Sequence, residues 1–253
     1  MIVPIALEFY GWSRYFLDMC GRFTQIAGWQ TLLNRFLIRL ISSEIKEQTQ
    51  PRYNLAPSQD AYVVTSKGTV ESRELTEMKW GLIPAWSKNA AMQFNTINAR
   101  AEGVKESPVF REPFKRSRCV VPANGFFEWQ AGSSPKQPYY IYPAESGELF
   151  AFAGLWDCWT GSAGQTVNSF TILTTHANAF MQPIHQRMPV ILSDEDLPLW
   201  LGEEVDAGRN LETLLKPAPD ETMAKHKVST YVNKVSHESP ETILPYEPME
   251  WDF

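Results

Sequence analysis

The stretch RCVVPANGFFEW, residues 118–129, carries the strongest fold signal in this chain. Valine and phenylalanine are typical of buried β-strands, and they crowd both halves of the stretch. Between the halves lies Asn124-Gly125, a pair that favours a tight turn. We therefore predict one or two buried strands within residues 118–129, with a bend at Asn124-Gly125.

Similar signals continue outward in both directions from this stretch. Short runs with strand-like composition occupy residues 61–65, 74–83, 139–142, 149–156, 169–175 and 227–232. Helical patterns are confined to residues 28–48, 177–182, 194–201 and 210–214. Strands fill the middle of the chain and helices lie at its edges. The prediction is an α+β protein with a mainly antiparallel β-sheet or open-barrel core and peripheral helices.

The composition is that of a soluble globular protein. Of 253 residues, 43% are hydrophobic and 21% are charged. No apolar run approaches the roughly 20 residues needed to span a bilayer, so no membrane association is expected. Three cysteines, Cys20, Cys119 and Cys158, form no CxxC pair and suggest no disulfide framework. We expect a cytoplasmic protein, and nothing in the sequence demands more than a monomer.

The net charge of −6 is unevenly distributed along the chain. Residues 1–193 carry 18 Lys and Arg against 15 Asp and Glu, whereas residues 194–253 carry 5 against 14. A nucleic-acid-binding face on the first three quarters is therefore compatible with the acidic total, because local potential governs phosphate contacts. The densest basic stretch is Arg111 to Arg118, for which a solvated loop is the simpler interpretation.

Several common catalytic and cofactor patterns are absent from the sequence. The four histidines, at positions 176, 185, 226 and 237, show no metal-ligand spacing with the cysteines. The chain has no Walker A loop, no dinucleotide-binding glycine motif and no Gly-x-Ser-x-Gly elbow. We predict neither a metal nor a cofactor.

Three polar residues lie in apolar or strand-like surroundings. Glu128 stands between Phe127 and Trp129, and His185 precedes the apolar run Val190-Ile191-Leu192. A partly desolvated carboxyl has a raised pKa and suits proton transfer, and a histidine titrates near neutrality. Asn98 follows the strand-like run Phe94–Ile97. Each residue taken alone is more often structural than catalytic.

Cys20 follows Met19, so removal of the preceding residues would expose a cysteine with both a free amine and a thiol. An α-amine has a pKa of about 7.7–8.0, which leaves a useful fraction neutral at physiological pH. Such a pair can capture an aldehyde as an imine and then close a five-membered ring. While the preceding residues are attached, Cys20 has no free amine. Residues 1–18 do not have the pattern of a signal peptide.

Taken together, these segments resemble the SRAP family, the SOS-response-associated peptidases understood as sensors of abasic sites in single-stranded DNA. The matching segments, in family order, are Met19–Phe23, Pro51–Pro57, Lys79–Pro84, Asn98–Glu102, Arg118–Trp129, Ala153–Trp156 and His185–Leu192. The resemblance implies one SRAP domain over residues 19–240, followed by a C-terminal tail at 241–253. It also implies an SRAP fold and single-stranded DNA with abasic sites as the partner.

The resemblance assigns a role to each candidate residue. The amine of Cys20 would attack the ring-opened sugar and its thiol would close a thiazolidine, giving a covalent DNA–protein crosslink. The other matches are Glu128 for proton transfer, His185 as acid or base, Asn98 for hydrogen bonding to the reacting centre, Arg22 and Arg100 for flanking phosphates, and Trp129 and the region of Trp80 for stacking on bases or wedging against them.

The sequence departs from the family pattern in three places. Asn124 replaces the usual Asp, Gly103 replaces a common Thr, and residues 1–18 precede the cysteine. We interpret this leader as a start codon assigned too far upstream, with autoproteolytic release of Cys20 as the alternative. Two other functions stay open: a thiol peptidase that uses Cys20 with His185 and Glu128, and a non-catalytic module that binds single-stranded DNA.

Overall fold

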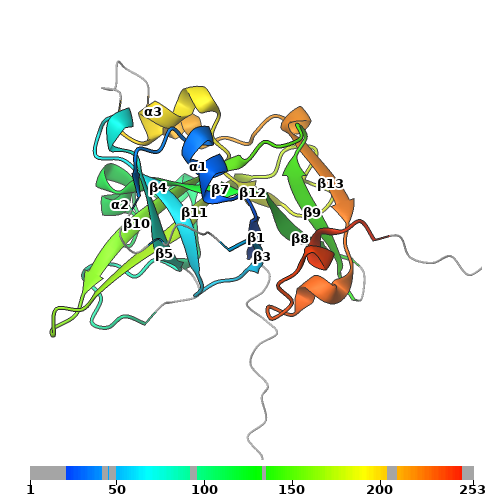
Figure 1. Cartoon of the computed structure of the whole chain (residues 1–253), viewed down its shortest axis with the longest axis horizontal. Coiled ribbons are helices and arrows are strands. Elements are labelled where there is room, and N and C mark those ends of the chain that lie inside the picture. The colour runs from blue at the N-terminus through cyan, green and yellow to red at the C-terminus, as the bar shows by residue number, and fades with distance from the viewer. Residues whose placement is uncertain are drawn as a thin grey trace, which may run out of the picture.

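The computed structural model describes residues 21–41, 45, 50–91, 96–132, 135–203 and 210–246 (Figure 1). The predicted leader at 1–18, Met19, Cys20 and the last seven residues of the predicted tail lie outside the described residues. Within this part of the chain, no helix is both long and apolar enough to cross a membrane.

One sheet has five strands in the order β13-β9-β8-β1-β3, and its pairs are antiparallel. Its strands are β1 (Arg22–Gln25), β3 (Arg52–Leu55), β8 (Gly125–Gln130), β9 (Gln137–Pro143) and β13 (Met223–Lys227). This sheet lies at the right of Figure 1, with β8, β9 and β13 side by side. It carries the predicted residues Arg22, Glu128 and Trp129.

The second sheet runs β12-β11-β10-β7-β4-β5-β2. Its strands are β2 (Leu40–Ile41), β4 (Asp60–Thr65), β5 (Glu74–Trp80), β7 (Arg118–Ala123), β10 (Phe150–Thr160), β11 (Thr166–His176) and β12 (Arg187–Pro189), and β6 (Asn98–Arg100) pairs with β11. A parallel pairing of Phe170 with Trp80 joins β11 to β5. This contact closes β11, β10, β7, β4 and β5 into a five-stranded barrel, which confirms the predicted β core and shows that the barrel is closed.

The segment 118–129 connects the two sheets. Its first half is β7 in the barrel, its second half is β8 in the five-stranded sheet, and the chain bends at Asn124 as predicted. The side-chain oxygen of Asn124 accepts hydrogen bonds from the backbone amides of Ile26 (2.6 Å) and Ala27 (3.0 Å). The next position must be a glycine, Gly125, because a Cβ there would lie 2.5 Å from the carbonyl oxygen of Ile141. These contacts fix where the chain leaves one sheet for the other.

Alternate residues of the barrel strands supply two hydrophobic clusters. On β7, Cys119 and Val121 belong to one cluster and Val120 to the other, as expected for side chains that alternate between the two faces of a strand. The first cluster includes Phe23, Phe126 and Ile141 of the five-stranded sheet. The second packs against the helices α1 (Trp29–Arg35), α2 (Arg111–Arg116) and α3 (Leu197–Trp200), through Leu32, Phe114 and Trp200.

The predicted helix at 28–48 is wrong over residues 36–41, and residues 42–44 and 46–48 lie outside the described residues. The helix α1 ends at Arg35, Leu37 adopts a positive φ of 51°, and Leu40–Ile41 form β2. The backbone amides of Arg39 and Leu40 both donate to the carbonyl of Arg73, and the Arg73 side chain binds the carbonyl of Phe36 at 2.8 Å. Pairing with the edge of β5 therefore replaces further helical turns.

Two other predicted elements need correction. Residues 177–182 form turns instead of a helix, held by the side chain of Asn178, which accepts from the amide of Met181 at 3.0 Å. The strand predicted at 227–232 lies earlier, as β13, and the chain then forms the 3₁₀ turn η7 (Thr230–Asn233). The predicted helices at 194–201 and 210–214 are confirmed as short helices, namely the 3₁₀ helix η4 (Asp194–Asp196) followed by the α-helix α3, and the 3₁₀ helix η5 (Leu211–Leu214).

Candidate functional site

Glu128 is a buried carboxyl on β8, with only 5% of its surface exposed. Burial raises its pKa to about 8, although the amide of Trp129 and the charge of Lys136 lower it somewhat. One carboxyl oxygen has no hydrogen-bond partner among the described residues. A carboxyl in this state is largely protonated at neutral pH, so it can donate a proton to a reacting group.

The strand β8, which carries Glu128, lies between β9 and β1, and β1 begins two residues after Cys20. Arg22 and Phe127 are register partners in the antiparallel β1–β8 pair. Gly21 comes directly before Arg22 in the chain, and Glu128 follows Phe127 on β8. Consequently, the chain that continues from Cys20 enters the fold beside the strand that carries the buried carboxyl.

Arg22 is part of the wall of this region. Its guanidinium donates to the side chain of Asn54 and to the carbonyl of Val232, both at 2.9 Å, and lies 5.9 Å from the ring centre of Trp129. Only 7% of Arg22 is exposed. Burial lowers the pKa of Arg22, and the charge of Glu238 partly offsets this effect. Because carbonyl and amide oxygens already hold the guanidinium, Arg22 offers less to a phosphate than the sequence suggested.

Asn98 and Arg100 lie on β6, which runs parallel to β11. Asn98 is opposite Ile172 and Arg100 is opposite Thr174. Asn98 is buried, whereas Arg100 is exposed. Residues two apart on a strand share a face, so both side chains leave β6 on the same side, Asn98 within the protein and Arg100 at its surface.

His185 is held by the backbone of Arg187. Nδ1 of His185 lies 3.1 Å from the amide nitrogen of Arg187 and 3.2 Å from its carbonyl oxygen, so the backbone of Arg187 fixes the orientation of the ring through this nitrogen. The Arg187 side chain forms a bidentate ion pair with Glu102, with both N–O distances 3.0 Å, and it also donates to the carbonyl of Thr174 at 2.7 Å. Thr174 is also the register partner of Arg100, so Arg100 and Arg187 both lie near the end of β11.

Trp80 connects the two groups of site residues. Its indole N–H donates to the carbonyl of Ile97, beside Asn98, at 2.9 Å. Its ring packs against Phe23, beside Arg22, with the centroids 4.9 Å apart. Trp80 is fully buried, so its ring has no exposed face in this structure on which a base could stack. It is the last residue of the barrel strand β5 and belongs to the hydrophobic core, so it joins the two groups of site residues from inside the protein.

Trp86 was not among the predicted site residues, although 68% of it is exposed. It lies on the loop after β5, and both neighbours are fixed to β10. The amide of Ala85 donates to Asp157 at 2.8 Å, and the carbonyl of Ser87 accepts from the indole of Trp159 at 2.8 Å. The sequence does contain a signal for this residue. Trp86 comes two residues after Pro84 in a short polar loop, where the sequence shows no apolar segment that would bury it.

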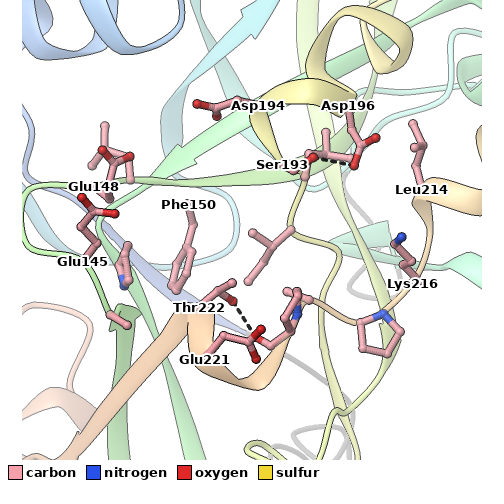
Figure 2. Close-up of a pocket in the computed structure, with 18 of the residues that line it drawn as sticks. Glu145, Glu148, Phe150, Ser193, Asp194, Asp196, Leu214, Lys216, Glu221 and Thr222 are labelled. Carbon is pink, nitrogen blue, oxygen red and sulfur yellow. Dashed lines mark hydrogen bonds between the residues drawn. The ribbon is translucent and has the colours of Figure 1, made fainter.

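A separate pocket of about 640 Å³ lies between the ends of β9, β10 and β12 (Figure 2). Phe150 contributes to its floor, and five carboxylates line it, from Glu145, Glu148, Asp194, Asp196 and Glu221. Arg35 binds Glu148 at 3.0 Å and Asp194 at 2.6 Å. None of the predicted site residues lines this pocket, and its negative charge disfavours phosphates. Among the described residues no cluster of three or more histidine, cysteine or acidic side chains could hold a metal.

The fold is thus a closed β-barrel joined to a five-stranded sheet, with a buried carboxyl of raised pKa on the strand beside β1. The chain belongs to the SOS response associated peptidase (SRAP) family, whose model matches residues 19–235. This membership confirms the family resemblance read from the sequence.

Named relatives and solved structures agree with this assignment. The chain is 38% identical over 226 residues to the abasic site processing protein YoqW of Bacillus subtilis, covering 89% of this chain and 99% of that protein. It is 37% identical to the abasic site processing protein HMCES of Gallus gallus, covering 67% of that protein. A crystal structure of a Bacteroides thetaiotaomicron protein matches with a TM-score of 0.80 and 28% identity, covering 90% of this chain and all of that one.

Proposed function

We propose that this protein processes abasic sites in single-stranded DNA by forming a covalent crosslink through Cys20. The observation that carries the proposal is the buried Glu128, with its pKa raised to about 8, beside the strand that follows Cys20. The names of the relatives, abasic site processing proteins, supply the substrate class. A proton donor beside an amine is what capture of an aldehyde requires.

The proposed chemistry has two steps. The neutral amine of Cys20 adds to the C1′ aldehyde of the ring-opened sugar, and loss of the resulting hydroxyl as water gives an imine. The thiol then adds to the same carbon, its proton passes to the nitrogen, and a thiazolidine ring closes. Glu128 donates the proton with which the hydroxyl group leaves as water, and Nε2 of His185 exchanges protons with the sugar. Asn98 orients the reacting centre.

The DNA contacts follow from exposure and charge. Arg100 is exposed near the end of β11, where its side chain is suited to contact a phosphate, whereas Arg187 is already paired with Glu102. The half-buried Trp129 and the exposed Trp86 offer aromatic surface for stacking on unpaired bases. Arg22 shapes the site, and the exposed Trp86, in place of the buried Trp80, supplies the second stacking surface.

The proposal requires a free amine at Cys20. The test incubates chains 1–253 and 19–253, with N-terminal masses verified, with single-stranded DNA that contains one abasic site. We expect an SDS-stable protein–DNA band wherever Cys20 is terminal. Cys20→Ser should give only an imine, which borohydride traps, whereas Cys158→Ser should crosslink like the wild type. A folded chain with a verified N-terminal Cys20 and no band would refute the proposal.

The family description as a peptidase keeps autoproteolysis as a second candidate. In this case Cys20, with His185 and Glu128, would release residues 1–19 from the longer chain. Mass spectrometry of purified 1–253 distinguishes the two. Loss of residues 1–19 that is blocked by Glu128→Gln indicates self-cleavage, and an intact chain excludes it under those conditions.

A further inference from the structure

The surface turn formed by residues 231–237 presents two stacked rings. The rings of Tyr231 and His237 lie 3.7 Å apart with planes at 15°. Nδ1 of His237 is 2.6 Å from the carbonyl of Tyr231, and the amide of His237 donates to the carbonyl of Lys234 at 3.0 Å. The turn is therefore closed by its own hydrogen bonds, and the ring pair is held in place before any ligand binds.

This turn is fixed to the candidate site. Asn233 accepts the indole N–H of Trp129 at 2.8 Å, and the neighbouring carbonyl of Val232 accepts from Arg22. The side-chain amide of Asn54 donates to the carbonyls of Lys234 and His237, both at 3.0 Å. In Figure 1, the orange and red segment that contains η7 lies beside β8. The ring pair is consequently two residues along the chain from a side chain that touches Trp129.

The fold does not need the ring pair for packing. Val232 fills the core position of this turn, in a cluster with Phe127 and Tyr140, and is fully buried. Tyr231 is 40% exposed, and Lys234 is exposed as well. The nearby carboxylate of Glu238 faces inward, where it accepts from the backbone amides of Tyr53 and Asn54. The outer surface of the turn thus combines aromatic faces with a cation.

We propose that this turn is a second nucleotide subsite, next to the one at Trp129. A base that flanks the abasic site stacks on the Tyr231–His237 pair, and Lys234 contacts the adjacent phosphate. Aromatic faces with a neighbouring cation bind single strands with little sequence preference, because every base has a face to stack. The proposal rests on the proposed function, since it extends the same DNA path beyond the reacting sugar.

The test measures non-covalent affinity of the full chain for single-stranded DNA with a central tetrahydrofuran abasic analogue, which lacks the aldehyde and cannot crosslink. Tyr231→Ala should weaken binding at least about fivefold. Tyr231→Phe, which keeps the ring, should bind like the wild type. Lys234→Ala should weaken binding and reduce its salt dependence.

Shortening the DNA from one end and then from the other separates a stacking role from a structural role. On the strand trimmed at the side that reaches the turn, wild type and Tyr231→Ala should bind equally. Equal affinity of the two on the full-length strand, or a defect in Tyr231→Ala that persists on both trimmed strands, would overturn the subsite. Absence of any binding by the wild type would instead count against the proposed function itself.

Discussion

Trp80 and Phe23 pack with their ring planes at 70° and their centroids 4.9 Å apart. Through this contact, and through its hydrogen bond to Ile97, Trp80 joins the strand that carries Arg22 to the segment that carries Asn98. The two halves of the site belong to different sheets, so their relative position depends on this buried ring.

The first prediction concerns Trp80 itself. Trp80→Ala should lower the free energy of unfolding by about 3–5 kcal/mol, because it removes a fully buried indole and leaves a cavity. Trp80→Phe should cost less, since the ring contact with Phe23 is largely kept while the hydrogen bond to Ile97 is lost. Urea denaturation measures both variants. A wild-type midpoint for Trp80→Ala would contradict the structural role assigned here.

Trp86 should behave in the opposite way. Trp86→Ala should leave the thermal midpoint unchanged, because the ring is 68% exposed. It should weaken binding to single-stranded DNA by about 1–3 kcal/mol if the ring stacks on a base. Fluorescence anisotropy with the tetrahydrofuran oligonucleotide gives the affinity, and Trp86→Phe is the matched control that keeps an aromatic face. Unchanged affinity in Trp86→Ala would remove this residue from the proposed DNA path.

The stability of the protein should depend on pH through Glu128. Its pKa is raised to about 8 in the folded chain, against about 4.3 for an unfolded glutamate, so the folded state holds the proton more tightly. This contribution is complete below about pH 4 and is lost as the pH rises through about 8. Glu128→Gln cannot ionise. We expect it to gain stability relative to the wild type by at most about 1.4 kcal/mol per pH unit in that window.

Urea titrations of both proteins at a series of pH values provide the measurement. The stability difference between wild type and Glu128→Gln should be constant at the acidic end, which serves as the internal control. A difference that stays constant from acidic pH up to pH 9 would show that Glu128 has the same pKa in the folded and unfolded chains, which contradicts its raised pKa. The same variant should slow crosslinking at neutral pH, because an amide is a poor proton donor.

Asn124 should tolerate aspartate and not alanine. Its side-chain oxygen accepts two backbone amides where the chain passes between the sheets, and a carboxylate can accept the same pair. Asn124→Ala should therefore destabilise the fold by about 1–3 kcal/mol, since both amides lose their partner. Thermal unfolding of the two variants is the check, with Asn124→Asp expected within about 0.5 kcal/mol of the wild type. Equal losses in both variants would show that the amide nitrogen matters too.

Strand prediction succeeded where the local pattern was strong. The stretch 118–129 has β-formers on both sides of Asn124-Gly125, and it forms β7 and β8 with the bend between them. Helix prediction failed after Arg35, because the helical spacing of apolar residues continues there although the helix itself ends. The carbonyl of Arg73, far along the sequence, accepts the amides of Arg39 and Leu40, and a pattern of side chains does not report such a backbone contact.

The tryptophans show the same division within the site. The sequence placed Trp80 and Trp129 in suitable motifs, but exposure is a property of packing. Trp80 lies on β5 where this strand pairs with β11, and it is fully buried. Trp86, six residues later, is exposed on a loop that is hydrogen-bonded to β10. The turn at 231–237 was also missed, because its contact with Trp129 joins residues about a hundred positions apart.

The sequence by itself determined the β core, the family, and the candidate residues Cys20, Asn98, Glu128 and His185, because ordered motifs and strand patterns are local. Only the tertiary structure decided that the barrel closes through β5 and β11, that Glu128 is buried with a raised pKa, and which tryptophan faces solvent. The physical reason is that desolvation and exposure arise from contacts between distant segments. Residue type specifies what a side chain can do, and packing sets the environment in which it does so.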